Sequence, residues 1–530
     1  VDEVVGVNSL RLRGAQNLPS EFLTGFQISA LGDDRGLEIV EHDVEGGTVT
    51  LADIAEAQFP AGTAVELRSG EEAPLLAARL ITGTPLKGVL PAVALRLATT
   101  RGTNALLERR GAATAHFITA GFEDLLYIGD QHRPDLFALN IERPAPLPEM
   151  VVGVPGRVDA LGNEIEAFDR DAVEQTIGGV LAAGFRCASI TLLHGHRNPA
   201  HETILEGMLV EAGFDTVSRS SAISPFQGLL RRSQTSSTDA YLGPVITDYL
   251  GEVGRGLPDE GSSLHVMTSA GGLVSTKDYR SMDSLLSGPA GGVVGAAMSG
   301  RLSGSERVIA FDMGGTSTDV SRFDGDFEYV FEHRVGPVAL AVPALAIETV
   351  AAGGGSICHV EQGRLAVGPQ SAGANPGPAA YGAGGPLTIT DVNLLLGRLV
   401  PDRFPIPIDV AAAQREFGEL GHELGSTGED EEILEGLLRI ADERMAEAIR
   451  HISVRKGIDP AGYSLVAFGG AGGQHACRVA GLLGIEEVIL PGDAGHLSAL
   501  GLGHAVIERF AHREILRPLD EAGEGIETLF

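Results

Sequence analysis

Short apolar runs alternate with longer amphipathic stretches over most of the chain. From Leu95 onward, runs such as 115–120 predict strands, and they alternate with stretches of helical periodicity such as 171–183. The alternation returns after about residue 218, where several apolar runs end in glycine-rich loops. Strands that alternate with helices are typical of an α/β layer. We therefore predict an α/β fold for most of the chain.

Two stretches depart from this alternation. Residues 1–90 contain short β-rich runs separated by polar turns, which predict a β-rich N-terminal insertion. A long helix is predicted over Ile433–Arg455, where apolar residues recur on one face, and Gly457 ends it. This apolar face indicates core packing. Its members are Leu434, Leu437, Leu438, Ala441, Met445, Ala448, Ile449 and Ile452.

The length and charge of the chain limit the classes of protein to which it can belong. At 530 residues the chain is long enough for two or three lobes with a substantial core. It has 39 Lys and Arg residues against 71 Asp and Glu residues, which gives a formal net charge of −32. Such a field repels a phosphodiester backbone, so we expect no nucleic-acid partner. A small anionic ligand would need local backbone N–H groups and a divalent cation in order to bind.

Cysteine usage and hydropathy indicate a reduced, cytoplasmic setting without a membrane partner. The three cysteines are far apart and lack CxxC spacing, which argues against a disulfide framework or a thiolate zinc site. No stretch has the uninterrupted apolar length of a membrane span. The first 20 residues also lack the basic start and apolar run of a signal peptide.

The sharpest local motif is a glycine-rich turn between two predicted strands, Asp312-Met313-Gly314-Gly315-Thr316-Ser317-Thr318-Asp319. A further turn and strand follow it rather than a helix, so we predict an antiparallel hairpin and exclude a Rossmann fingerprint. The N–H groups of Gly314 and Gly315 and the Thr316 hydroxyl can point at a phosphate. Asp312 and Asp319 can hold a hydrated Mg²⁺. The alternative is an ordinary hairpin whose polar residues bond only within their own turn.

A second glycine-rich loop joins a predicted strand, 464–468, to a predicted helix, and its sequence is Gly469-Gly470-Ala471-Gly472-Gly473. Four glycines in five positions leave room for a ring or ribose against the backbone, and the helix N-terminus favours negative charge. Taken alone, the loop is also typical of a tight strand-to-helix turn. A third glycine-rich stretch begins at Ser287, which we predict to cap a helix that starts at Pro289.

The motifs together carry a family resemblance. They are SGPAGGVVGA at 287–296, DMGGTSTDVS at 312–321 and FGGAGGQHA at 468–476. This set resembles the hydantoinase A/5-oxoprolinase family, a branch of the actin-like, sugar-kinase and Hsp70 ATPase superfamily. In the first half, TTRGTNALLERRGA at 99–112 and LLHGHRNPAHE at 192–202 are similar to the amino-terminal region of that family. The resemblance covers nearly the whole chain from about Val65.

The resemblance implies two actin-like, ribonuclease H-like lobes around a nucleotide cleft. It divides the chain into an N-terminal region at 1–200, an ATPase domain at 201–508 and the start of a C-terminal region at 509–530. It implies ATP and Mg²⁺ as cofactors, with the turn at 312–319 on the phosphates. The residues that it assigns to the adenosine side are Gly469, Gly470, Gly472 and Gly473. Candidates for the substrate side are Thr99, Thr100, Arg101 and Asn104.

The implied activity is ATP-dependent hydrolysis of a small cyclic amide, either 5-oxoproline or a hydantoin. The chain would phosphorylate the amide carbonyl, with a hydantoinase B-type subunit as its partner in an oligomeric, multi-subunit enzyme. Two alternatives stay open. One is a subunit of an ATP-dependent acetone- or acetophenone-type carboxylase, and the other is a small-molecule kinase or nucleotide-gated binding module of the actin-like fold.

The chain departs from the family pattern at both ends. Family members usually open with a D-x-G-G-T-F-T-D loop that faces the second loop across the cleft, whereas this chain begins at Val1-Asp2-Glu3. It stops within a predicted helix start at Leu519–Phe530. We therefore expect a fragment that binds ATP weakly.

Several histidines lie in or beside these motifs. The three in the HGHRNPAHE segment are His194, His196 and His201. Their HxH pattern can chelate a metal, but no carboxylate or cysteine spacing accompanies it, so a positioning or turn-bonding role is favoured. His475 and His496 could contact nucleotide or substrate, or simply begin helices. The loop 353–356 also resembles a family segment, but its residues give it no role.

Overall fold

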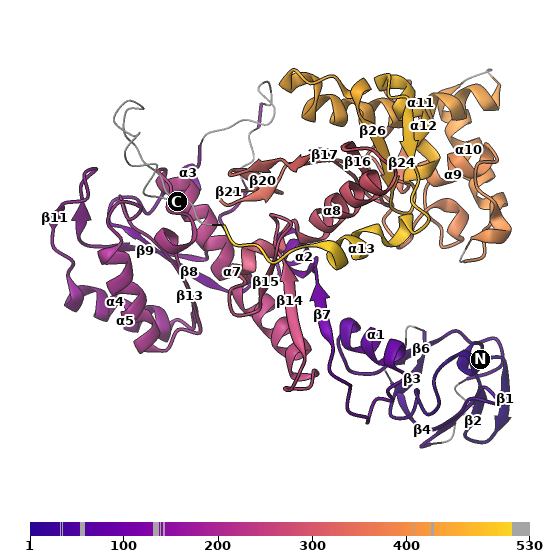
Figure 1. The fold of residues 1–530 in the computed structure, drawn as a ribbon, viewed down its shortest axis with the longest axis horizontal. Helices are drawn as coiled ribbons and strands as arrows, with labels where there is room; N and C mark the ends of the chain where they lie inside the picture. The colour runs from indigo at the N-terminus through magenta and orange to yellow at the C-terminus, as the bar shows by residue number, and fades with distance from the viewer. Residues whose placement is uncertain are drawn as a thin grey trace. The chain divides into compact units, whose positions relative to one another are not determined.

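The computed structural model describes most of the chain (Figure 1). The described residues are 1–31, 33, 35–53, 59–130, 137, 139–140, 144–404, 406–425 and 429–510. They belong to two compact units. Unit 1 comprises Val1–Leu97, Pro244–Val266 and Ser275–Asp278, and unit 2 comprises Ala98–Gly243, Met267–Val274 and the described part of Tyr279–Phe530. The predicted helix start at Leu519–Phe530 lies outside the described residues.

Unit 1 contains a six-stranded antiparallel sheet with the strand order β1-β2-β5-β4-β3-β6. Side chains alternate across the sheet: in β5, Val49 and Leu51 are buried while Thr48 and Thr50 are partly exposed. The strands are β1 (Glu3–Gly6), β2 (Ser9–Arg11), β3 (Gln27–Ala30), β4 (Leu37–Asp43), β5 (Thr48–Leu51) and β6 (Val65–Arg68). These strands lie in the stretch for which β-rich runs were predicted. They are followed by α1 (Ala73–Thr82) and by β7 (Ala94–Leu97), which pairs in parallel with β14 (Ser263–Met267).

Unit 2 contains two larger sheets besides several two-stranded ones, and the first is a four-stranded parallel sheet with the order β13-β12-β8-β9. Every residue of β8 and of β12 is buried, so both faces of these two strands are covered and neither strand alternates between a buried and an exposed face. Its strands and associated helices are β8 (Thr114–Thr119), β9 (Met150–Val154), α4 (Arg170–Ala182), β12 (Cys187–Thr191), α5 (Ala200–Ala212), β13 (Thr216–Arg219) and the first part of α7 (Leu229–Arg255), whose residues from Pro244 onward belong to unit 1.

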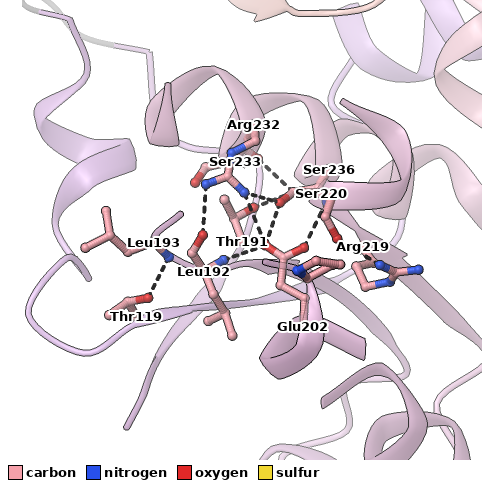
Figure 2. Close-up of polar contacts among 12 residues, drawn as sticks. Thr119, Thr191, Leu192, Leu193, Glu202, Arg219, Ser220, Arg232, Ser233 and Ser236 are labelled. Carbon is pink, nitrogen blue, oxygen red and sulfur yellow. Dashed lines mark hydrogen bonds and ion pairs between the residues drawn. The ribbon is translucent and has the colours of Figure 1, made fainter. Parts of the chain in front are cut away.

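A buried polar network lies between this parallel sheet and α7 (Figure 2). Glu202 of α5 and Arg232 of α7 form an ion pair, with 3.2 Å between Nη1 and Oε1. The Glu202 carboxylate also accepts hydrogen bonds from the N–H of Leu192 and from the hydroxyl of Ser220, each at 2.8 Å. Arg232 donates to the Leu192 carbonyl oxygen, also at 2.8 Å. Leu192, the first residue after β12, is therefore held through both its N–H and its C=O group.

The second sheet of unit 2 has the strand order β18-β17-β16-β26-β27, with β23 paired to β17. A large core packs it against helices that include α11 and α12. The strands are β16 (Arg307–Met313), β17 (Thr318–Asp324), β18 (Asp326–Phe327), β23 (Ile347–Val350), β26 (Ser464–Phe468) and β27 (Glu487–Ile489). The helices are α8 (Ser287–Leu302), α9 (Ile389–Leu395), α10 (Val410–Leu424), α11 (Asp430–Ile452), α12 (Gly472–Leu483) and α13 (Leu497–His504).

The remaining α-helices and strands among the described residues lie outside these larger sheets. They are α2 (Arg101–Leu107), α3 (Leu125–Ile128), β10 (Arg157–Val158), β11 (Glu164–Glu166), α6 (Ser220–Ile223), β15 (Leu273–Ser275), β19 (Tyr329–Val330), β20 (His333–Val335), β21 (Val338–Leu340), β22 (Ala344–Leu345), β24 (Ser356–Glu361) and β25 (Arg364–Ser371).

The structure confirms the predicted mixed α/β fold and the predicted long helix. α11 spans Asp430–Ile452, and all eight apolar positions of its predicted core face are buried. The helix ends three residues earlier than predicted, and a short 3-10 turn, Val454–Lys456, leads to Gly457. None of the described helices combines the length and the apolar character that crossing a membrane requires.

Candidate nucleotide site

The glycine-rich turn at 314–317 joins β16 and β17 of the second sheet. The two strands are antiparallel, with Asp312 opposite Asp319 and Met313 opposite Thr318, which confirms the predicted hairpin. The N–H of Gly314 donates to the carbonyl oxygen of Ser317 at 3.1 Å and closes the turn. Gly315 and Thr316 are exposed at its tip, so their polar groups are accessible to a ligand.

The second glycine-rich loop begins at the same edge of the sheet. β26 runs parallel to β16, and Phe468 at its end lies beside Asp312. The N–H of Ala471 donates to the carbonyl oxygen of Met313 at 3.0 Å. A Cβ atom placed on Gly469 would lie 2.4 Å from Oδ1 of Asp312. The two loops, which are about 150 residues apart in the sequence, are therefore in direct contact.

A third glycine loop packs against the hairpin turn, a role that its residues alone did not predict. The N–H groups of Gly354 and Gly355 donate to the carbonyl oxygens of Gly314 and Gly315 at 3.0 and 2.6 Å. A Cβ atom on Gly353 would lie 2.7 Å from the carbonyl carbon of Thr316. Only glycine permits such a close approach of two backbones. The three consecutive glycines were the available signal, but their partner is distant in the sequence.

Burial raises the pKa values of the two carboxyl groups beside the turn. Burial, together with the negative charge of Asp319, raises the pKa of Asp312 to about 6. Burial also raises the pKa of Asp319, although the hydroxyl of Thr349, which donates to Oδ1 at 2.6 Å, opposes the shift. Neither carboxyl group forms an ion pair with another described residue. Two such oxygen donors fit a hydrated Mg²⁺, which is usually held by one or two carboxylates together with waters and phosphates.

The raised pKa of Asp312 predicts a pH-dependent gain in stability when this residue is replaced by asparagine. The pKa of this carboxyl group rises from its ordinary value of 3.8 to about 6 in the folded chain, so folding is progressively disfavoured as the pH rises from about 4 to 6. Asparagine removes this cost, so Asp312→Asn should stabilise the ligand-free chain by about 1–2 kcal/mol above pH 6, after allowance for the partial exposure of the carboxyl group. Thermal melts of both chains at pH 8 and pH 4 test this. The gain should shrink at the lower pH, and a variant that melts earlier at pH 8 would contradict the direction of the shift.

The loop 469–473 leaves space on its outer side. Gly470 and Gly473 are exposed, and no atom lies within 4 Å of a Cβ atom built on Gly470. The predicted helix follows as α12, which begins at Gly472. Its N-terminal N–H groups favour an anionic neighbour.

The four residues predicted for the substrate side lie at the start of α2. Thr99 is buried, and its N–H and C=O exchange hydrogen bonds with the Ser287 hydroxyl at 3.3 and 3.1 Å. Thr100, Arg101 and Asn104 are exposed. The prediction that Ser287 caps a helix beginning at Pro289 is wrong, because α8 already includes Ser287 and the hydroxyl bonds to Thr99 instead of to the helix.

The histidines beside the motifs differ in their surroundings. His475, predicted as a possible nucleotide contact, is fully buried and bonds to Asp442, whereas His496 is exposed. His201 pairs with Glu164 at 2.8 Å, and the ring centres of His194 and His196 are 6.1 Å apart. Within the described part of the chain, no group of three or more His, Cys, Asp or Glu side chains is arranged to hold a metal ion.

Two family models and several relatives match the chain. The hydantoinase/oxoprolinase model matches residues 232–510, and the model of the hydantoinase/oxoprolinase N-terminal region matches residues 46–213. The chain is 40% identical over 457 residues to 5-oxoprolinase 1 of Arabidopsis thaliana, covering 78% of this chain and 36% of the relative. It is 41% identical over 450 residues to 5-oxoprolinase of Saccharomyces cerevisiae, covering 77% and 35%. The chain thus spans about a third of the length of these relatives.

Two solved structures are similar to the fold. The ATP-dependent caprolactamase from Pseudomonas jessenii superimposes with a TM-score of 0.75 at 27% identity, covering 95% of this chain and 74% of that one. The nucleotide-free structure of an acetone carboxylase superimposes with a TM-score of 0.65 at 25% identity, covering 78% and 61%. The first family model covers more than half of the chain, and its match contains both glycine-rich loops of the candidate site. The chain belongs to the hydantoinase/oxoprolinase family.

Proposed function

We propose that this chain binds MgATP at the paired glycine loops and uses it to activate the carbonyl group of a small cyclic amide. The observation that carries the proposal is the direct contact between the hairpin turn and the loop 469–473, through the Ala471 N–H and the Met313 carbonyl oxygen. One nucleotide can reach two loops only if they open at the same edge of the sheet. In this chain they do so because β16 and β26 are parallel neighbours.

Each loop has a chemical role in this proposal. The N–H of Gly315 and the hydroxyl of Thr316, both at the exposed tip of the turn, bind the phosphates, while Gly314, whose N–H closes the turn onto Ser317, lines the same site. Asp312 and Asp319 hold Mg²⁺ through water. The cation compensates the negative charges of the two carboxylates and of the phosphates. The adenosine side is formed by Gly469, Gly470, Gly472 and Gly473.

The chemistry balances in three steps. The γ-phosphoryl group moves from ATP to the amide oxygen, so that ADP leaves and an O-phosphorylated imidate forms. Water then attacks the same carbon, the C–N bond of the ring breaks with the nitrogen leaving as an amine, and an acyl phosphate forms, which a second water hydrolyses to the carboxylate and inorganic phosphate. Phosphorylation is needed because an unstrained lactam is a poor electrophile. The phosphoryl transfer itself is catalysed mostly by positioning of the reactants and by stabilisation of the charge on the transferred group.

The names of the relatives support a cyclic amide as substrate. The chain is similar to two proteins named 5-oxoprolinase and to the caprolactamase subunit alpha of Pseudomonas jessenii, which is 32% identical over 428 residues. We propose 5-oxoproline or a hydantoin as substrate and a B-type subunit or domain as partner. The proposed architecture has two actin-like lobes around the nucleotide, with an N-terminal region at 1–200, an ATPase domain at 201–508 and the start of a C-terminal region at 509–530. Thr99, Thr100, Arg101 and Asn104 are proposed for the substrate side.

A second candidate function is favoured by the similarity to an acetone carboxylase structure. In that case the activated group would be the enolate oxygen of a ketone, and carboxylation would replace ring opening. The phosphate chemistry at Asp312 and Asp319 would be shared. The two candidates therefore differ in substrate rather than in nucleotide handling.

The experiment that tests the proposal combines nucleotide binding with a substrate panel. Titration calorimetry should show magnesium-dependent binding of ATP, and Asp312→Asn should weaken it about tenfold or more, because one of two carboxylates for the cation is lost. With a B-type partner added, ATP consumption should depend on 5-oxoproline or a hydantoin and yield the ring-opened product. Consumption that instead requires bicarbonate and acetone would favour the carboxylase. If the parent chain and Asp312→Asn bind ATP equally tightly in the presence of magnesium, Asp312 does not hold the metal ion.

A further inference from the structure

A polar cluster lies buried directly behind the loop 469–473. His475, in the first turn of α12, is fully buried. Its Nδ1 atom is 2.6 Å from Oδ1 of Asp442 on α11, and its Nε2 atom is 3.1 Å from the amide nitrogen of Asn393 on α9. Because the Asn393 amide donates to Nε2, the hydrogen-bond network places the ring proton on Nδ1, which donates to Asp442. Oδ2 of Asp442 forms an ion pair with Arg478 at 2.9 Å.

The cluster is connected to both loops of the candidate site. On α9, Thr390 donates to the Gly354 carbonyl oxygen from its N–H at 2.7 Å and from its hydroxyl at 2.9 Å. The N–H of Gly354 in turn donates to the carbonyl oxygen of Gly314 in the hairpin turn. On the other side, His475 lies four residues after Ala471, which bonds to the hairpin directly. One continuous path of bonded residues therefore runs from the phosphate side of the site to the adenosine side.

The cluster is polar although the core around it is mostly apolar, and stability alone does not explain this. The helices that carry it contribute mostly apolar side chains to one large core, including Leu438, Met445 and Val479. A buried polar or charged group costs desolvation free energy, and an apolar replacement of similar size often preserves stability. What hydrogen bonds add is direction, since they fix the relative orientation of three helices in a way that apolar packing does not.

We propose that His475, together with Asp442 and Asn393, is a positioning element that sets the spacing between the phosphate turn and the adenosine-side loop. The inference rests on the proposed function, because the spacing matters only if one nucleotide contacts both loops. A nucleotide that meets two preset loops binds more tightly than one that must order them, so the cluster contributes to affinity without touching the ligand. His475 is thus a positioning residue and not a catalytic one.

The test uses the whole chain with MgADP as the binding probe and MgATP as the substrate. His475→Leu removes both ring hydrogen bonds and should weaken MgADP binding about tenfold or more. His475→Asn places an amide nitrogen near the position of Nδ1 and should restore part of that loss. Asn393→Ala cuts the connection to α9 while it keeps the His475–Asp442 bond, so it should raise the KM for ATP several-fold and change kcat by less than about twofold. If His475→Leu does not fold, Asn393→Ala decides the question.

Val479→Ala is the matched control for a purely structural role. Val479 is fully buried and lies one turn further along α12, and its truncation leaves a cavity without breaking a hydrogen bond. It should lower the melting temperature but leave MgADP affinity within about twofold of the parent chain. Equal losses of affinity in Val479→Ala and His475→Leu would overturn the inference, as would unchanged affinity in Asn393→Ala. If instead neither the parent chain nor Asp312→Asn binds MgADP, the proposed function itself is wrong.

Discussion

Glu202→Ala is expected to lower the free energy of unfolding of the parallel-sheet part of unit 2 by about 3–5 kcal/mol. The side chains of Glu202 and Arg232 are 0% and 1% exposed, so neither charge is solvated by bulk water. Removing the carboxylate takes away the negative charge that lies 3.2 Å from the buried guanidinium. It also leaves the N–H groups of Leu192 and Ser221, each of which donates to Glu202 at 2.8 Å, without an acceptor. Loss of one partner of a buried pair therefore costs far more than the net value of the pair.

Urea unfolding followed by circular dichroism measures this effect, and α5 offers a matched control. Glu206 lies one turn after Glu202 and pairs with Arg219 at 2.9 Å, but its side chain is 33% exposed. Glu206→Ala should shift the unfolding midpoint much less than Glu202→Ala, because water can replace the lost partner. The double variant Glu202→Leu with Arg232→Met should recover part of the loss, since it removes both charges. Equal midpoints for the two alanine variants would contradict the assigned burial of the pair.

This network also explains the HGHRNPAHE segment better than metal binding does. Glu202 is the last residue of the segment, and its carboxylate reaches back to the N–H of Leu192 just before the segment begins. Gly195 lies against the same carboxylate, since a Cβ atom there would be 2.4 Å from Oε1. His194 has a φ of 58°, a strained value for a residue with a side chain. The residues of this segment therefore fit one tightly held turn at the end of β12.

Features with a local cause could be predicted from the sequence. The hairpin around Gly314 follows from two apolar runs joined by a short polar turn, and α11 follows from the helical spacing of its apolar residues. The mixed α/β fold follows from the alternation of such elements. In each case the deciding interactions lie within a few turns of helix or across one hairpin, so a sequence window contains them.

Features that depend on distant partners could not be predicted. The sequence does not indicate that Gly354 packs against Gly314, because the contact joins two loops separated by 40 residues. The orientation of His475 depends on Asp442 and Asn393, which are 33 and 82 residues away. A histidine in the first turn of a helix after a glycine loop can face a ligand or the core. Only the position of the two partners decides between these orientations.

Gly469→Ala is expected to weaken MgATP binding by about 100-fold or more and to lower stability by about 2–4 kcal/mol. Gly469 has a φ of 79°, which strains any residue with a side chain. A Cβ atom there would lie 2.4 Å from Oδ1 of Asp312 and 2.5 Å from the carbonyl oxygen of Met313. The backbone cannot easily shift away, because Met313 also accepts the N–H of Ala471. The methyl group must therefore displace the proposed magnesium carboxylate or separate the two loops.

Gly470→Ala separates the effect on folding from the effect on the ligand. Gly470 is exposed, and a Cβ atom there would meet no protein atom within 4 Å, so the melting temperature of the ligand-free chain should change little. If the nucleotide lies against this backbone as proposed, the added methyl group should still weaken MgATP binding several-fold. Calorimetric titrations and melts of both variants provide the comparison. Parent-like affinity in Gly469→Ala would show that contact between this loop and Asp312 is not required, and the nucleotide would then have to bind elsewhere on the chain.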